Sequence, residues 1–278
     1  MKKLNKKYEG WDSTQHLNEF DLWNNLSSYE FRYRWGSFLE NKILIKELKS
    51  KNYSLLEVGC ATGTTVKWLK LNRIFKKDKY LGIDLSGPAI NKAKYLYKDA
   101  TFKKVDIDFL KNLKYKYDYV FSRDTLMHQE NPFKFLEELL AVSQKGLILR
   151  TRTKDKGKTE FDVNKSCQMH YDNYWMPYIV INLNEIIDFL RKFKFIKTVT
   201  INRSYGVLGG HNFRYLPKDL FIKATGGAET TIHIEIDREK TINDFEINYT
   251  NILEGHSFLN VKTFKKYVFA IARKLKVI

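Results

Sequence analysis

Apolar and polar positions over residues 54–153 follow two alternating rhythms that predict strands and helices in turn. Short apolar runs predict buried β-strands at 54–58, 80–85, 101–107, 117–124 and 146–153. Apolar residues at helical spacing predict helices at 64–72, 88–97 and 131–143. Strands that alternate with helices form a parallel sheet with crossover helices on both faces. The pattern therefore predicts an α/β fold with a doubly wound, Rossmann-like sheet.

The flanking segments add elements on both sides of this core. Apolar residues at helical spacing predict an amphipathic helix over 29–49. Two strands at 195–206 and 219–225 predict a terminal hairpin, which brings the sheet to seven strands. A further alternating strand (230–237) and a basic helix (261–276) follow. We divide the chain at these changes into an N-terminal helical cap (1–53), the domain with the seven-stranded sheet (54–225) and a C-terminal strand–helix extension (226–278).

The composition is that of a globular protein. Hydrophobic residues make up 43% of the chain, and no apolar run approaches the ~20 residues that a membrane helix requires. The charged N-terminal residues have no apolar segment behind them, so they do not form a secretory signal. Cys60 and Cys167 lie far apart and the histidines are dispersed, so neither residue type has the spacing of a metal site. We expect a cytoplasmic protein without membrane insertion and without a bound metal.

The net charge of +17 is strongly positive. Such a charge attracts polyanions and favours nucleic acid or phosphorylated compounds as partners. The lysines are scattered along the chain and not gathered in one block, which is also typical of an ordinary solvated surface. The charge therefore leaves a nucleic-acid partner open without requiring one.

The first predicted strand runs into a glycine turn, LLEVGCATGTT at 55–65. Gly59 and Gly63 permit positive φ and a close approach of the backbone to a ligand. The turn lacks the third glycine of the dinucleotide motif G-x-G-x-x-G and the G-K-[ST] of a phosphate-binding loop. Asp84 closes the second strand 25 residues after Gly59, which suits a carboxylate that accepts hydrogen bonds from a ribose diol. The turn and the acid together predict a nucleoside-binding site at the carboxyl ends of the strands.

Four segments in order, EVGCATG, YLGIDLS, KKVDID and YDYVFSRDTLMHQENP, resemble the successive motifs of class I S-adenosylmethionine-dependent methyltransferases. The resemblance is strong over 54–153 and weak up to residue 225. It implies a methyltransferase that binds S-adenosyl-L-methionine and releases S-adenosyl-L-homocysteine. By the same resemblance, the cofactor-binding residues are Arg34, Glu57, Gly59, Cys60, Ala61, Gly63, Asp84, Leu85, Asp106, Ile107, Ser122 and Arg123.

Several of these assignments have alternatives. Asp108 is an alternative to Asp106, which the resemblance places at the adenine amino group. By the resemblance, Arg32 and Arg34 reach the cofactor carboxylate from the preceding helix; the alternative is that they face solvent or cap the core. We expect Cys60 to be a small residue of the turn and not a nucleophile, because nothing nearby in the sequence would stabilise its thiolate.

Methyl transfer to a hydroxyl group requires a base that removes the proton. His128 follows the fourth strand, in the segment that borders the acceptor pocket in the family, and histidine titrates near neutral pH. It is our candidate for the catalytic base. A purely structural histidine at this position is the alternative, and Asp124 and His170 are reserve candidates.

Arginines and aromatic residues predict the acceptor site. Arg150 and Arg152 end the fifth strand and are placed to bind a phosphate or carboxylate with bidentate geometry. Salt bridges to the acidic loop 155–162 are the alternative. Aromatic residues in HYDNYWMPY suit a sugar face or a nucleobase. The further substrate-binding candidates are His170, Tyr174, Trp175, Tyr178 and His211.

Three functions agree with these residues. The first is O-methylation of a small anionic or sugar-type acceptor, with bacterial surface-polysaccharide biosynthesis as its setting. The second is RNA methylation, which the charge favours, although the chain lacks the N-P-P-[YF] tetrad and the Pro-Cys pair of two such enzyme classes. The third is a non-catalytic methyltransferase-like binding protein, which the intact cofactor motif disfavours.

Overall fold

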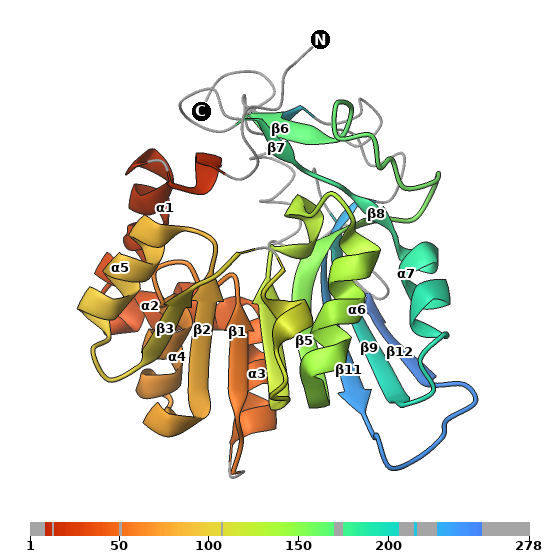
Figure 1. Cartoon of the computed structure of the whole chain (residues 1–278), viewed down its shortest axis with the longest axis horizontal. Coiled ribbons are helices and arrows are strands. Elements are labelled where there is room, and N and C mark those ends of the chain that lie inside the picture. Colours follow the sequence, from red (N-terminus) through yellow and green to blue (C-terminus); the bar gives the residue numbers. More distant parts are fainter. Residues whose placement is uncertain are drawn as a thin grey trace, which may run out of the picture.

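A mixed β-sheet in the order β12-β9-β11-β5-β4-β1-β2-β3 runs through the molecule (Figure 1). The computed structural model describes residues 9–12, 14–49, 52–106, 108–169, 175–205, 214–215 and 227–251. The parallel part of the sheet consists of β1 (Leu55–Val58), β2 (Tyr80–Asp84), β3 (Thr101–Lys104), β4 (Tyr117–Arg123) and β5 (Ser143–Lys154). These strands confirm the predicted α/β class and its Rossmann-like sheet.

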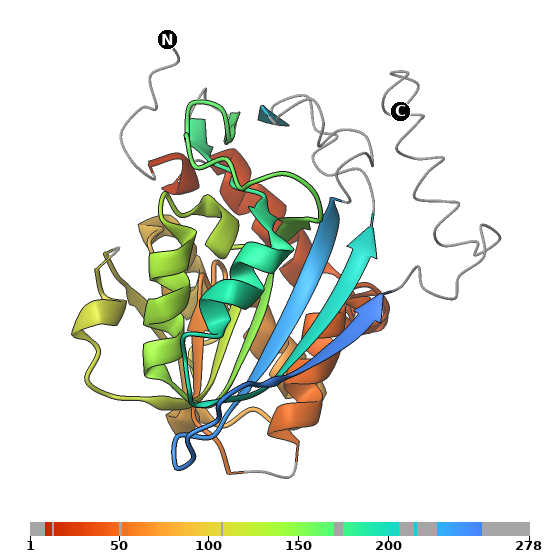
Figure 2. The ribbon, with the colours of Figure 1, turned by 90° about the vertical axis from the view of Figure 1, so that its right-hand side faces the viewer.

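Helices cover both faces of the sheet, as Figure 2 shows. One face packs against α6 (Pro132–Val142) and α7 (Leu183–Leu190), and the other against α3 (Leu39–Leu48), α4 (Thr64–Leu71) and α5 (Gly87–Leu96). Successive strand residues point to opposite faces, so Val120 joins the first cluster and Phe121 the second. Burial on both faces explains why the parallel strands are continuous apolar runs in the sequence.

The other end of the sheet is built from strands that follow α7. β11 (Ala228–Ile236) pairs antiparallel with both β5 and β9 (Ile196–Tyr205). We expected 219–225 to be the hairpin partner of β9, but the strand in that position is β11; 219–225 and 261–276 lie outside the described residues. β12 (Glu246–Asn251) adds a parallel edge strand beside β9, and the short β8 (Ile181–Asn182) pairs with β5. The sheet therefore exceeds the seven strands expected.

The N-terminal region contains more elements than the one helix predicted over 29–49. A 3-10 helix (Glu9–Asp12) and α1 (Thr14–Asn25) precede α2 (Ser28–Arg34), and a 3-10 turn separates α2 from α3. A capping box between Ser27 and Glu30 starts α2. Gly36 lies in the break, where a Cβ atom would come within 2.6 Å of the Trp68 ring. The helix prediction was therefore wrong at this break, where Phe38 adopts an extended backbone conformation (ψ 135°) between the 3-10 turn and α3.

A small second sheet lies above the carboxyl ends of the parallel strands (Figure 1). It consists of β10 (Arg214–Tyr215), β6 (Cys167–Met169) and β7 (Trp175–Pro177). Within the ranges that the structure describes, no helix has the length and apolar character needed to cross a lipid bilayer.

Candidate functional site

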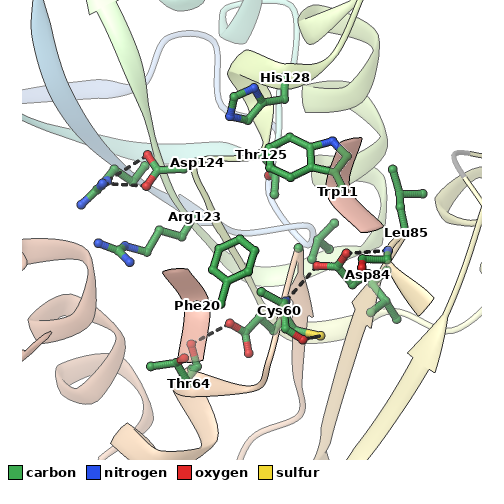
Figure 3. Close-up of a pocket in the computed structure, with 18 of the residues that line it drawn as sticks. Trp11, Phe20, Cys60, Thr64, Asp84, Leu85, Arg123, Asp124, Thr125 and His128 are labelled. Atoms are coloured by element: carbon green, nitrogen blue, oxygen red, sulfur yellow. Dashed lines mark hydrogen bonds and ion pairs between the residues drawn. The ribbon is translucent and has the colours of Figure 1, made fainter. Parts of the chain in front are cut away.

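A cavity of about 460 Å³ opens at the carboxyl ends of β1, β2, β4 and β5. Many residues predicted from the sequence line it: Glu57, Gly59, Cys60, Ala61, Asp84, Leu85, Asp106, Arg123, His128, Arg150 and Arg152. Figure 3 shows several of them, with Asp84 and Leu85 on one side and Arg123 and Asp124 on the other. The fold thus brings residues from four strands and their loops around one space.

The remaining predicted residues are placed differently. Gly63, Ser122 and Tyr178 are described but do not line this cavity. Trp175 lies in β7, and of its side chain the structure describes nothing. Four further predicted residues lie outside the described ranges: Ile107, His170, Tyr174 and His211.

The glycine turn after β1 requires glycine at two positions. Gly59 and Gly63 have φ of 78° and 80°, in the left-handed region. A Cβ atom on Gly59 would lie 2.0 Å from the Thr125 methyl carbon, and one on Gly63 would lie 2.8 Å from the Phe102 ring. The amides of Gly59 and Cys60 both donate to the Ile83 carbonyl oxygen, at 2.9 and 3.0 Å. The turn is therefore held against β2, and its backbone forms part of the cavity wall.

Asp84 orders the turn from the end of β2. Its Oδ2 accepts a hydrogen bond from the Ala61 amide at 2.8 Å, and its Oδ1 accepts one from the Ser86 amide at 2.9 Å. Burial raises the pKa of Asp84, although these backbone hydrogen bonds oppose the shift. The carboxylate consequently has a fixed orientation at the cavity edge. Ala61 itself has a φ of 45°, a backbone conformation that is rare for alanine.

Glu57 is a buried carboxyl group in the cavity floor. Thr65 Oγ1 donates to its Oε1 at 2.6 Å, and the Tyr80 hydroxyl donates to its Oε2. Burial raises the pKa of Glu57 to about 7, although these hydrogen bonds oppose the shift. The side chain therefore changes charge close to neutral pH. Burial also raises the pKa of the neighbouring Cys60 thiol, which agrees with a turn residue and not with a nucleophile.

The two candidate acids after β3 differ in their surroundings. Asp106 lines the cavity. Asp108 does not line it, and its carboxylate pairs with Lys111. The geometry therefore favours Asp106 over Asp108 as the residue that faces a ligand.

His128 ends the 3-10 helix Leu126–His128 that follows β4. It is 7% exposed and lines the cavity. Its Nδ1 lies 2.8 Å from the Pro177 carbonyl oxygen, and its ring packs edge-on against Trp11 and Tyr178, with centroid distances of 4.8 and 5.7 Å. Because a carbonyl oxygen only accepts hydrogen bonds, Nδ1 must carry the proton. In the neutral ring, Nε2 is then the proton-accepting nitrogen.

Three arginines (Arg123, Arg150 and Arg152) and three acids (Glu40, Asp124 and Glu229) form a largely buried network of ion pairs. Arg150 binds Asp124 with two nitrogens, at 3.0 and 2.6 Å, and reaches Glu40 of α3 at 3.3 Å. Arg152 contacts Asp124 and Glu229, each at 3.1 Å. Neither arginine pairs with the acidic loop, where Arg203 instead contacts Asp155.

The network keeps Asp124 ionised. Burial alone would raise the pKa of Asp124, but Arg150, Arg152 and Arg123 outweigh burial and hold the pKa well below its usual range. A carboxylate of such low basicity is a poor proton acceptor at neutral pH. Asp124 therefore positions the arginines, and His128 remains the stronger candidate for a base.

Aromatic side chains from the N-terminal region close one side of the cavity, and the sequence analysis did not anticipate them. This aromatic wall consists of Trp11, Phe20, Trp23, Trp35 and Phe38. Arg34, predicted to reach the cofactor, is exposed and does not line the cavity; its guanidinium lies 5.3 Å from the Trp23 ring centroid. Arg32 donates to the Leu71 carbonyl oxygen at 2.5 Å. The signal in the sequence was the density of aromatic residues over 11–38, which also fits ordinary helix packing.

Comparisons with known proteins identify the family. Residues 49–197, more than half of the chain, match a family model described as a methyltransferase domain. A search of curated proteins finds no match. Similar solved structures include the plantazolicin methyltransferase BpumL in complex with a monoazolic desmethylPZN analog and SAH. It is 18% identical with a TM-score of 0.49, and the match covers 83% of this chain and 93% of that one.

Two further solved structures are similar at this level. Magnesium protoporphyrin IX methyltransferase from Synechocystis PCC 6803 with bound SAM is 16% identical with a TM-score of 0.45, covering 81% of this chain and 92% of that one. The N-terminal domain of EvdMO1 with SAH is 13% identical with a TM-score of 0.49, covering 70% and 79%. By its family match, the chain belongs to the class I methyltransferases, enzymes that use S-adenosyl-L-methionine as their cofactor.

Proposed function

We propose that this methyltransferase methylates a hydroxyl oxygen of a small anionic or sugar-type acceptor, with His128 as the base. The observation that carries the proposal is the hydrogen bond between His128 Nδ1 and the Pro177 carbonyl oxygen. That bond makes Nε2 the proton acceptor on a buried side chain that lines the same cavity as the glycine turn.

The residues around the glycine turn fit the cofactor. The left-handed Gly59 keeps side-chain atoms out of the cavity wall, and the orientation of Asp84 is set by two backbone amides. We assign Asp84 to the ribose hydroxyls, Asp106 to the adenine amino group and Glu57 to the methionine end. Leu85, Cys60 and Ala61 complete this part of the wall. When bound, S-adenosyl-L-methionine supplies a methyl group activated by its sulfonium charge.

The remaining chemistry belongs to the protein. Methyl transfer needs the acceptor oxygen in line with the methyl group, so the walls of the cavity act mainly by orienting the acceptor. The acceptor hydroxyl would give its proton to His128 Nε2 as the methyl–sulfur bond breaks and the new C–O bond forms, with S-adenosyl-L-homocysteine as the leaving group. The Pro177 carbonyl would stabilise the resulting imidazolium by accepting from Nδ1. Trp11 packs edge-on against the imidazole, which is 7% exposed.

The cavity chemistry supports an anionic or sugar-type acceptor. Arginines border it beside aromatic faces, and aromatic rings pack well against the apolar faces of sugars. Phosphorylated or nucleotide-linked sugars combine both properties. We therefore propose surface-polysaccharide biosynthesis as the setting, with RNA as the competing acceptor class because of the net charge of +17.

The test measures S-adenosyl-L-homocysteine release with phosphorylated sugars, with neutral sugars and with RNA as acceptors. We expect turnover on phosphorylated sugars and none on RNA. With the best acceptor, His128→Ala should lower kcat by ~10²-fold or more while leaving cofactor affinity unchanged. Leu126→Ala is a matched control, because it perturbs the same 3-10 helix without removing a base. RNA turnover that falls steeply with salt, or full activity in His128→Ala, would contradict the proposal.

A further inference from the structure

Trp35, one of the residues that line the cavity, has an indole N–H without an acceptor among the described residues. The residue is 5% exposed. A buried donor without an acceptor destabilises a protein, so such groups usually have a function. An indole nitrogen only donates, which means that its partner must be an acceptor and not an ammonium group.

A guanidinium group with unused donors lies against the same ring. The Arg123 guanidinium carbon is 4.4 Å from the ring centroids of both Trp35 and Phe38. Arg123 Nε donates to Glu40 at 2.9 Å, whereas its two Nη groups make no hydrogen bond or ion pair with any residue that the structure describes. Arg123 also lines the cavity, and Figure 3 shows it on the same side of the cavity as Asp124.

The neighbouring arginines are not available in this way. Arg150 already holds both carboxylate oxygens of Asp124 and also contacts Glu40. Arg152 divides its donors between Asp124 and Glu229. The sequence pointed to Arg150 and Arg152 as the anion-binding pair, but carboxylates already engage both of them, whereas the Nη groups of Arg123 have no partner among the described residues.

We propose that the Arg123 Nη groups and the Trp35 indole N–H form a binding position for a carboxylate-type anion in the cavity. The inference deepens the proposed function, because it concerns the same cavity. A planar anion matches the guanidinium fork, and the aromatic faces around it exclude water and strengthen charge-assisted hydrogen bonds. The anion has two sources, the carboxylate of the cofactor or an anionic group on the acceptor.

The cofactor source is tested with a pair of ligands that differ only in the anion. S-adenosyl-L-homocysteine and its decarboxylated analogue are titrated calorimetrically into wild type, Trp35→Phe and Arg123→Gln. If the cofactor supplies the anion, wild type prefers the carboxylated ligand by about 10-fold or more, and each variant reduces this preference towards 1. The decarboxylated ligand should bind wild type and variants with similar affinity.

The acceptor source is tested with a second pair of probes. Binding of 4-fluorobenzoate and its neutral twin 4-fluorobenzamide is followed by fluorine NMR, with and without saturating S-adenosyl-L-homocysteine. If the acceptor supplies the anion, wild type prefers the benzoate by about 10-fold in the saturated protein, and both variants lose the preference. Loss of benzoate binding on saturation instead assigns the position to the cofactor carboxylate.

A matched variant separates a ligand contact from a packing effect. Trp68 packs in the same aromatic cluster, but its indole N–H already donates to the Asn41 carbonyl oxygen at 3.1 Å, and Trp68 does not line the cavity. Trp68→Phe should leave both charge preferences unchanged. The proposal is overturned if wild type shows no charge preference in either pair, or if Trp35→Phe and Arg123→Gln keep it. Absent binding of both adenosine ligands would instead overturn the proposed function, and the benzoate pair would still decide this inference.

Discussion

The two walls of the cavity are built in opposite ways. The wall formed by the glycine turn and the end of β2 is held in place by hydrogen bonds from backbone amides. The aromatic wall comes from separate N-terminal elements and is held by ring packing and by ion pairs such as Arg123 with Glu40. A local backbone motif has a strict sequence requirement, whereas a packed wall accepts many sequences. The first wall is therefore readable from the chain, and the second is not.

The largest expected effect comes from breaking the glycine turn. Gly59→Ala places a Cβ atom against Thr125 in a left-handed conformation and should lower the free energy of unfolding by about 3 kcal/mol. Urea unfolding measures this, and calorimetry with S-adenosyl-L-homocysteine measures the loss of binding. Gly87→Ala is the matched control, since its Cβ atom would meet only Lys104 side-chain atoms at 3.4 Å or more. Equal stability of the two variants would refute the strict requirement at Gly59.

A second prediction concerns the pH dependence of stability through Glu57. Its folded pKa of about 7 exceeds the ordinary value of 4.5, so the folded state holds a proton that the unfolded state releases. The stabilisation is complete below pH 4.5 and is lost as the pH rises through 7. Relative to Glu57→Gln, wild type should lose about 2 kcal/mol of unfolding free energy between pH 5 and pH 8. Glu239→Gln, at an exposed position, is the control and should follow wild type. If the unfolding free energies of wild type and Glu57→Gln changed with pH in the same way, the assignment would be contradicted.

A smaller effect is expected at the carboxylate that faces the ribose in our proposal. Asp84→Asn should weaken cofactor binding by ~1–3 kcal/mol, because the amide replaces an oxygen acceptor with a donor. Calorimetric titration measures the change, and thermal unfolding checks that the turn survives. Asp108→Asn serves as the comparison, since that carboxylate pairs with Lys111 outside the cavity lining. Unchanged affinity in Asp84→Asn would remove this residue from the ribose site.

The smallest effect is expected at Arg34. Its side chain is exposed and lies outside the cavity lining, so Arg34→Ala should change cofactor affinity by less than about 0.5 kcal/mol. Calorimetric titration of Arg34→Ala and Arg123→Gln with S-adenosyl-L-homocysteine compares the effects of the two arginines on cofactor affinity. A large loss of affinity in Arg34→Ala would show that the N-terminal region contacts the cofactor as the motif resemblance first implied.

The sequence predicted the parallel core well because each element carried its own periodicity. Strands β1 to β5 and helices α4, α5 and α6 all lie where apolar runs and helical spacing placed them. Predictions failed where pairing decided the outcome. The sequence of 228–236 does not indicate that this strand inserts between β5 and β9, because any strand with alternating apolar residues has the same pattern.

The same division holds within the site. The sequence predicted the glycine turn, Asp84 and the family. The turn requires glycines because of its backbone conformation, and Asp84 has a fixed position at the end of a strand. Only the tertiary structure shows that Asp124 binds the guanidinium group of Arg150 and that Pro177 sets the tautomer of His128. It also shows that Trp35 lies against Arg123. These relations join residues far apart in the chain. Their physical basis is distance and burial, which a linear pattern does not encode.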